Sequence, residues 1–186
     1  MGKTVLNILS VVFLVLYPFA IFFGLQHFSP RYVSILLIVM LVLRFCLRPE
    51  KADRFTRISA AALFSVGLVI LALTQMSNDA LFIRLYPFLM SMFLLAIFAY
   101  TLKKKPSMIE RFARVMHKDL PDEAIGYLEK VTMVWCAFFF LNGLIALYTT
   151  LYASLETWVW YNGFVSYIVI GILFVGEFLV RKIVAR

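Results

Sequence analysis

With 186 residues, 63% of them hydrophobic and only 15% charged, this chain is too apolar for a water-soluble domain. A soluble domain is typically about half apolar, with about a quarter of its residues charged. The net charge of +8 does not indicate a nucleic-acid partner, because the basic residues bunch between long apolar runs, as membrane topology requires. The cysteines, Cys46 and Cys136, lie far apart inside such runs, so neither a disulfide framework nor a zinc site is predicted.

The apolar runs predict an all-α fold, a polytopic bundle of about six transmembrane helices forming a single domain over residues 1–186. Each run is bounded by charge, proline or small polar residues, and the predicted spans are 5–25, 32–47, 58–76, 85–102, 131–151 and 158–180. A helix needs about 20 residues, and at least about 17, to cross the hydrocarbon. The second run is marginal, and its Arg44 would extend its side chain to the interface. Whether this run crosses fully stays open.

The distribution of Lys and Arg predicts that both termini lie on the cytoplasmic side. With the N-terminus inside, only Arg31 and Arg84 of the 18 basic residues fall on the outer face. Cytoplasmic segments of plasma-membrane proteins carry such an excess of basic residues. The predicted outer loops are short, at 27–31, 76–84 and 152–157.

The longest segment between predicted spans, 103–130, is expected to be cytoplasmic and to contain an interfacial amphipathic helix. From Ser107 onward, apolar residues recur at helical spacing, and Glu110 falls with the basic residues on the other face. Between residues 103 and 118 the formal charge is +5, from six basic residues and one acidic residue, which favours attraction to anionic lipid. The residues predicted to bind lipid or a partner are Lys103, Lys104, Lys105, Arg111, Arg114 and Lys118.

Three polar residues at membrane depth are further candidates: Asn142, Asn162 and Glu177. A glycine follows each asparagine, and glycine lets helices approach while the amide bonds across the contact at about 1 kcal/mol. Helix packing is the favoured interpretation of both pairs, and substrate contact is the alternative. Glu177 precedes Arg181 by one turn, so an interfacial ion pair to Arg181 or Lys182 is expected, with proton or cation handling as the alternative.

Catalytic patterns are weak in this sequence. His117 and Asp122 are separated by four residues, as in some acyltransferases, but two residue types at one spacing carry little information. A glycine-rich phosphate loop, a serine nucleophile elbow and paired carboxylates are not found. We therefore predict no enzyme activity, no metal and no cofactor.

Several segments, most of them in the C-terminal half, resemble an uncharacterised family of small bacterial inner-membrane proteins. These segments are 106–114, 119–121, 134–136, 138–139, 141–148, 161–163 and 176–177. Members are often encoded beside fatty-acid-synthase-like genes of the aryl polyene pigment type. A fainter similarity to the intracellular septation protein A family is found at Lys105-Pro106, Trp135, Phe138-Phe139, Gly143 and Trp158-Val159. Neither family carries established catalytic residues, so the resemblance implies none here.

Together these features predict a non-enzymatic bacterial inner-membrane protein that assists the synthesis or movement of an envelope lipid, such as an aryl polyene-type acyl product. Its expected partners are membrane lipids and an acyl carrier protein or another envelope-biosynthesis protein. One alternative is a small lipid transporter or flippase that uses Glu177 and the asparagines. A second is a membrane-embedded acyl-transfer enzyme that gathers His117, Asp119 and Asp122 around a pocket. Substrate and oligomeric state stay open.

Overall fold

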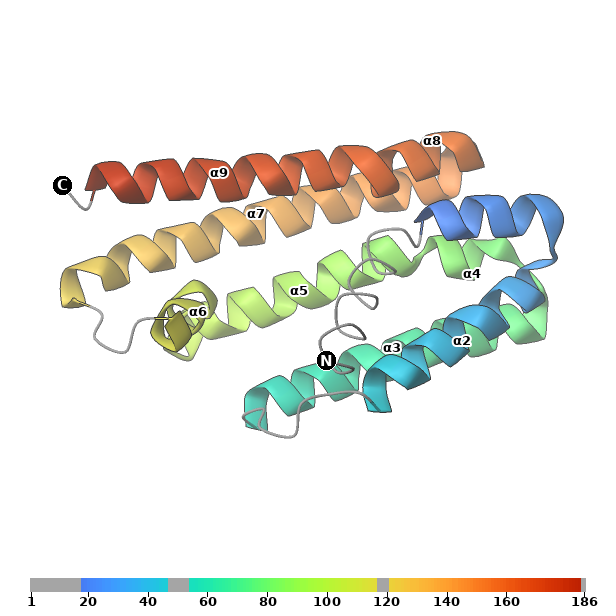
Figure 1. Ribbon diagram of the computed structural model, residues 1–186, viewed down its shortest axis with the longest axis horizontal. Coiled ribbons are helices and arrows are strands. Elements are labelled where there is room, and N and C mark those ends of the chain that lie inside the picture. Colours follow the sequence, from blue (N-terminus) through green and yellow to red (C-terminus); the bar gives the residue numbers. More distant parts are fainter. Residues whose placement is uncertain (1–17, 47–53, 117–120, 185–186) are drawn as a thin grey trace, which may run out of the picture. The chain divides into compact units, whose positions relative to one another are not determined.

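The structure is a computed structural model that describes residues 18–46, 54–116 and 121–184 (Figure 1). All regular structure in these ranges is helical. After helical residues 18–27, the elements are α2 (Pro30–Cys46), α3 (Arg54–Ser77), α4 (Ala80–Arg84), α5 (Tyr86–Lys103), α6 (Met108–Met116), α7 (Asp122–Tyr152), α8 (Leu155–Trp160), the π-helical turn η1 (Tyr161–Val165) and α9 (Ser166–Val184). The predicted all-α class is confirmed.

Three stretches of the described chain are long and apolar enough to cross a membrane: Ala80–Lys103, Asp122–Tyr152 and Leu155–Phe178. They overlap the last three predicted spans, which indicates a multi-pass membrane protein. Of the first three predicted spans, 5–25 lies mostly outside the described residues. Helices α2 and α3 hold shorter apolar stretches, Pro30–Val39 and Phe64–Ser77.

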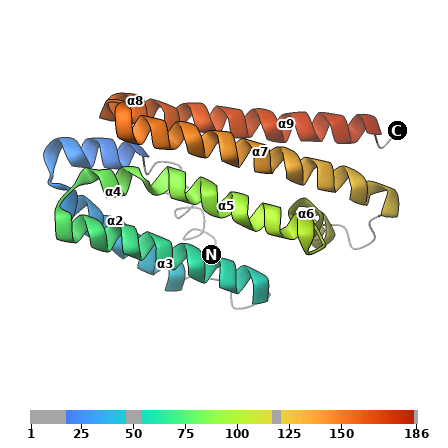
Figure 2. The same cartoon turned by 180° about the vertical axis from the view of Figure 1, so that it is seen from behind.

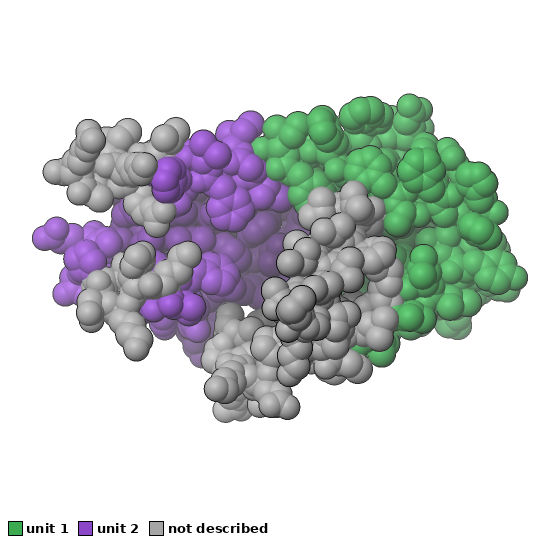
Figure 3. All heavy atoms as spheres, in the orientation of Figure 1, with its two compact units in different colours: residues 1–87, 146–168 green, residues 88–145, 169–186 purple. Residues whose placement is uncertain are grey.

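The chain divides into two compact units (Figure 3). Unit 1 comprises residues 1–87 and 146–168, and unit 2 comprises residues 88–145 and 169–186. In unit 1, α2 lies beside α3 in both views of the ribbon (Figures 1 and 2). The buried core of this unit consists of Ile21, Val33, Ile83, Trp158 and Val159.

The core of unit 2 is aromatic. Phe98 of α5 meets Phe139 of α7 edge to face, with ring centroids 5.0 Å apart. Trp135, also on α7, lies 4.9 Å from the ring of Phe174 on α9. Offset and edge-to-face aromatic pairs add about 0.5–1.5 kcal/mol each beyond the area that they bury. These contacts hold three helices together where apolar burial against lipid supplies little driving force.

The helix is interrupted at Leu85, between α4 and α5. The preceding residues, which were expected to form the outer loop 76–84, include the short helix α4. Asp79 accepts a hydrogen bond from the Leu81 backbone N–H at 2.8 Å and so begins α4 inside that loop. Pro87, at the second position of α5, has no N–H to donate to the preceding turn, which explains why α4 does not continue into α5. The structure therefore replaces much of the predicted loop with a helical turn.

Side chains from α7 and α8 bind the backbone at this interruption. The carbonyl of Arg84 accepts hydrogen bonds from Thr150 Oγ1 at 2.9 Å and from the Trp158 indole N–H at 3.0 Å. In return, Nη2 of Arg84 donates to the carbonyls of Thr149 and Ala153, at 3.0 and 2.9 Å. These carbonyls lie at the C-terminus of α7, where a cation offsets the helix dipole.

Candidate functional site

Asn142 lies at a close contact between α7 and α5. Its side-chain amide donates to Ser91 Oγ at 3.0 Å. A Cβ on the neighbouring Gly143 would lie 3.2 Å from Ser91 Cβ and would clash with the terminal methyl of Met92. Both observations support the helix-packing interpretation of Asn142-Gly143.

Asn162 is buried within η1, and its side chain forms hydrogen bonds with other residues of unit 1. Its Nδ2 donates to the Trp158 carbonyl at 2.9 Å and to Thr149 Oγ1 on α7 at 3.3 Å. A Cβ on Gly163 would lie 3.2 Å from Pro18 Cβ, so this glycine also permits a close approach. Among the described residues, Oδ1 of Asn162 has no hydrogen-bond partner. Packing is again the interpretation that the contacts support.

Glu177 is half-buried on α9, and its backbone carbonyl accepts a hydrogen bond from the Tyr127 hydroxyl of α7 at 3.2 Å. The side chains of Arg181 and Lys182 lie outside the described part of the structure. The expected ion pair to them therefore stays a prediction. His117 and Asp119, required by the acyl-transfer alternative, also lie outside it, whereas Asp122 is exposed at the start of α7.

Helix α6 follows the basic end of α5 and begins with half of a capping box. In the sequence Ser107-Met108-Ile109-Glu110, the carboxylate of Glu110 accepts a hydrogen bond from the Ser107 backbone N–H at 3.3 Å. The backbone N–H of Ile109 donates to Thr132 Oγ1 of α7 at 3.4 Å, which ties the first turn to that helix. The predicted amphipathic helix is thus present at Met108–Met116.

Helix α6 buries Glu110, which the sequence pattern grouped with the basic residues on the face opposite the apolar residues. Glu110 is only 4% exposed, whereas Phe112 and Val115 are 53% and 86% exposed. The reason is that Met108 and Ile109 pack against the aromatic core of unit 2, and this rotation carries the adjacent Glu110 inward. Part of the apolar face therefore points away from the protein.

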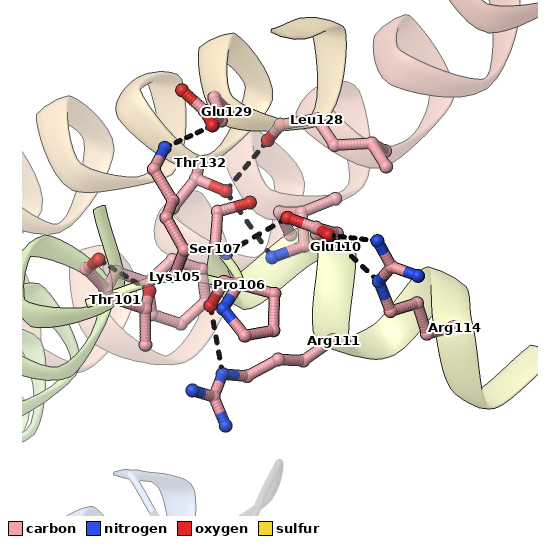
Figure 4. A network of polar contacts seen from close by, with 12 residues as sticks. Thr101, Lys105, Pro106, Ser107, Glu110, Arg111, Arg114, Leu128, Glu129 and Thr132 are labelled. Carbon is pink, nitrogen blue, oxygen red and sulfur yellow. Dashed lines mark hydrogen bonds and ion pairs between the residues drawn. The ribbon is translucent and has the colours of Figure 1, made fainter. Parts of the chain in front are cut away.

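Four charged side chains surround a shallow hollow of about 350 Å³ between α6 and the first turns of α7 (Figure 4). Lys105 forms an ion pair with Glu129. Arg114 donates from Nη2 and Nε to the same oxygen of Glu110, at 2.6 and 2.9 Å. The residues lining this hollow are Lys105, Pro106, Glu110, Arg114, Ile125 and Glu129.

The basic residues predicted to bind lipid divide into two groups. Lys105 and Arg114 are paired with carboxylates, and Arg111 Nε donates to the Pro106 carbonyl at 3.0 Å. Lys103 and Lys104 are exposed, and Lys104 Nζ lies 5.6 Å from the centre of the Tyr100 ring. Lys118 lies outside the described residues.

Sequence reasoning missed both acidic members of the hollow. The Ser-x-x-Glu pattern at 107–110 could have indicated that Glu110 turns back toward the helix start. Glu129 gives no local signal, since its partner Lys105 lies on the other side of α6 in the chain.

Comparison with known proteins gives no relative. No family model matches this sequence, and neither a curated protein nor a solved structure was found to be similar to it. The family resemblance described above therefore remains a prediction.

Proposed function

We propose that this protein is a non-enzymatic, multi-pass protein of a bacterial inner membrane that binds lipid head groups at its cytoplasmic surface. In this role it assists the synthesis or movement of an envelope lipid. The observation that carries the proposal is the charged hollow between α6 and α7, which we call the head-group hollow below. It lies at the end of Ala80–Lys103, a stretch long and apolar enough to cross a membrane. Charged side chains at the end of a span lie at the depth of lipid head groups.

The surface beside the hollow supports membrane contact. Phe112 and Val115 are exposed apolar residues on α6, and Lys103 and Lys104 are exposed cations at the end of α5. An interfacial helix inserts such apolar side chains among the acyl chains while its cations attract anionic lipid. Each Lys or Arg near an anionic surface contributes about 1 kcal/mol.

The topology belongs to the same proposal. We propose six spans with both termini cytoplasmic, which places the hollow and α6 on the inner face. The strong bias of Lys and Arg toward the segments on that side supports this orientation. Helices α2 and α3, of 17 and 24 residues, supply the length for the second and third spans.

The identity of the lipid is the finer part of the proposal. The sequence resemblance suggests an aryl polyene-type acyl product, and an acyl carrier protein as the soluble partner. An acidic partner of this kind would dock on the same exposed cations, Lys103 and Lys104.

The proposal is tested in cells that lack the protein, by comparing their envelope lipids with those of complemented cells. We expect one lipid class to change in amount or to accumulate on one face, and the wild-type gene to restore it. A Phe112→Asp/Val115→Asp variant should restore it poorly, whereas Phe112→Leu/Val115→Ile should restore it fully. An unchanged lipid profile in the deletion strain would contradict the proposal.

A further inference from the structure

We infer that the head-group hollow binds a phospholipid head group that carries both a phosphate and a primary ammonium, as in phosphatidylethanolamine. This inference rests on the proposed function, because that function places the hollow at a membrane surface. The inference goes beyond the proposed function by naming the chemistry of the head group.

The charge composition of the hollow is the first argument. Two cations, Lys105 and Arg114, alternate with two carboxylates, Glu110 and Glu129, in two ion pairs. An anionic ligand that engaged both cations would leave two partly buried carboxylates without partners, and a cationic ligand would do the reverse. Leaving the carboxylate of Glu110, whose side chain is buried, without its partner is strongly unfavourable. A zwitterion satisfies all four groups.

The depth of the charges sets the direction in which the ligand enters. The carboxylate side chains are 5% and 27% exposed for Glu110 and Glu129, whereas those of Lys105 and Arg114 are 47% and 43% exposed. The acids therefore lie deeper than the cations. In an ethanolamine phospholipid the ammonium is the outermost group and the phosphate is nearer the glycerol. Its ammonium would enter first, and its phosphate would stay at the rim with Lys105 and Arg114.

The lining also favours a primary over a quaternary ammonium. A primary ammonium has three N–H donors for carboxylate oxygens, and charge-assisted hydrogen bonds are about twice as strong as neutral ones. A quaternary ammonium has none and is instead held by aromatic faces. The hollow is lined by charged residues with Pro106 and Ile125, and no aromatic side chain is among its described lining residues.

Binding would exchange partners without a covalent step. The Lys105–Glu129 and Arg114–Glu110 pairs would open, the phosphate would accept from Lys105 and Arg114, and the ammonium would donate to Glu110 and Glu129. The hollow, at about 350 Å³, falls within the usual range of about 300–1,000 Å³ for small-ligand sites.

The test is native mass spectrometry of the full chain in detergent, titrated with phosphatidylethanolamine, phosphatidylcholine and phosphatidylglycerol of identical acyl chains. We expect the first to bind at least about tenfold more tightly than the other two. Glu129→Gln should reduce this preference by about tenfold, the loss of one charge-assisted hydrogen bond. Glu123→Gln, an exposed acid on the same helix outside the hollow, should leave it unchanged.

A second pair of variants tests the phosphate end. Lys105→Gln should weaken binding of the ethanolamine lipid, and Lys130→Gln, an exposed lysine outside the hollow, should not. Thermal unfolding of each variant checks that it is folded. Equal binding of the three lipids, or equal effects of the hollow variants and their controls, would overturn the inference.

Glycerophosphoethanolamine, which has the head group without acyl chains, separates a lipid from a soluble ligand. We expect it to compete only weakly with the lipid, and competition at equal concentration would overturn the assignment to a lipid. The inference and the proposed function fail separately. Unselective lipid binding overturns only the inference, whereas selective binding with unchanged envelope lipids in the deletion strain overturns only the function.

Discussion

The amide of Asn142 on α7 donates to the hydroxyl of Ser91 on α5, with 3.0 Å between Nδ2 and Oγ. Ser91 is buried. Asn142 is followed on α7 by Gly143, which packs closely against α5. A short polar contact beside a glycine is typical of membrane helices, because small residues let two backbones approach.

Removing this contact should loosen the protein without abolishing a specific chemistry. Asn142→Ala is expected to lower the free energy of unfolding by about 0.5–2 kcal/mol, the range for polar contacts between helices in lipid. A double-mutant cycle with Ser91→Ala, measured by unfolding in detergent, should give a clear coupling energy. Full stability together with complete loss of cellular function would instead favour substrate contact by Asn142.

Gly143 should tolerate enlargement less well than Gly171, which has open space around it. Gly143→Leu must displace Met92 and Ser91, and overpacking of this kind typically costs about 1–3 kcal/mol. Gly171→Leu is the matched control, because a Cβ at Gly171 has no described atom within 4 Å outside its own helix. A similar shift in melting temperature for both variants would show that the loss arises from the glycine itself.

Arg84 should be more important for stability than its position in a short segment between two predicted spans suggests. Arg84→Met removes two hydrogen bonds from a charged donor to the end of α7, and such bonds contribute about 1.5–3 kcal/mol each. We expect a lower melting temperature and faster proteolysis near residues 153–155. The exposed Arg31 provides the control, since Arg31→Met should change neither measurement by a comparable amount.

Local sequence signals predicted much of the fold. Pro121 followed by Asp122 and Glu123 is a typical helix-start pattern, and α7 begins at Asp122. The asparagine–glycine pairs indicated close helix contacts because both residue types favour them, and Gly143 and Gly163 lie at such contacts. Chain-local rules were sufficient in these cases.

The rest depended on contacts between distant residues. Periodicity divided α6 into two faces but did not indicate which residues pack on the protein, so the burial of Glu110 beside Arg114 was not predicted. The Lys105–Glu129 pair joins residues 24 positions apart, across a helix and a turn. The turn at Leu85 could not be predicted from the sequence, because residues 80–84 are too few to show a helical periodicity.

The predicted topology can be checked by labelling single cysteines in intact cells. Residues near Arg31 and Asp79 should react with a membrane-impermeant reagent, and residues near Lys51 and Lys104 should react only after the membrane is opened. The expectation follows from the bias of basic residues toward the inner face. Labelling at position 104 from outside would place the head-group hollow on the outer face instead of the inner face.

Reversing charge at two neighbouring sites should separate the surface role of the basic segment from its structural role. Lys103→Glu/Lys104→Glu changes exposed side chains, so the protein should keep its stability and lose affinity for anionic vesicles, by about 10² at low salt. The loss should shrink at physiological salt, where exposed charges are screened over about 8 Å.

Arg114→Glu should behave in the opposite way. It removes the partner of the buried Glu110 and adds a second carboxylate beside it, which leaves an uncompensated charge in the protein. We expect a lower melting temperature and more cleavage within α6 by an added protease, whatever the vesicle composition or the salt concentration. Glu110→Gln should partly rescue Arg114→Glu, because the amide can still accept a hydrogen bond from the Ser107 N–H without the repulsion. If Arg114→Glu were as stable as the wild type and lost only vesicle binding, Arg114 would belong with the exposed cations.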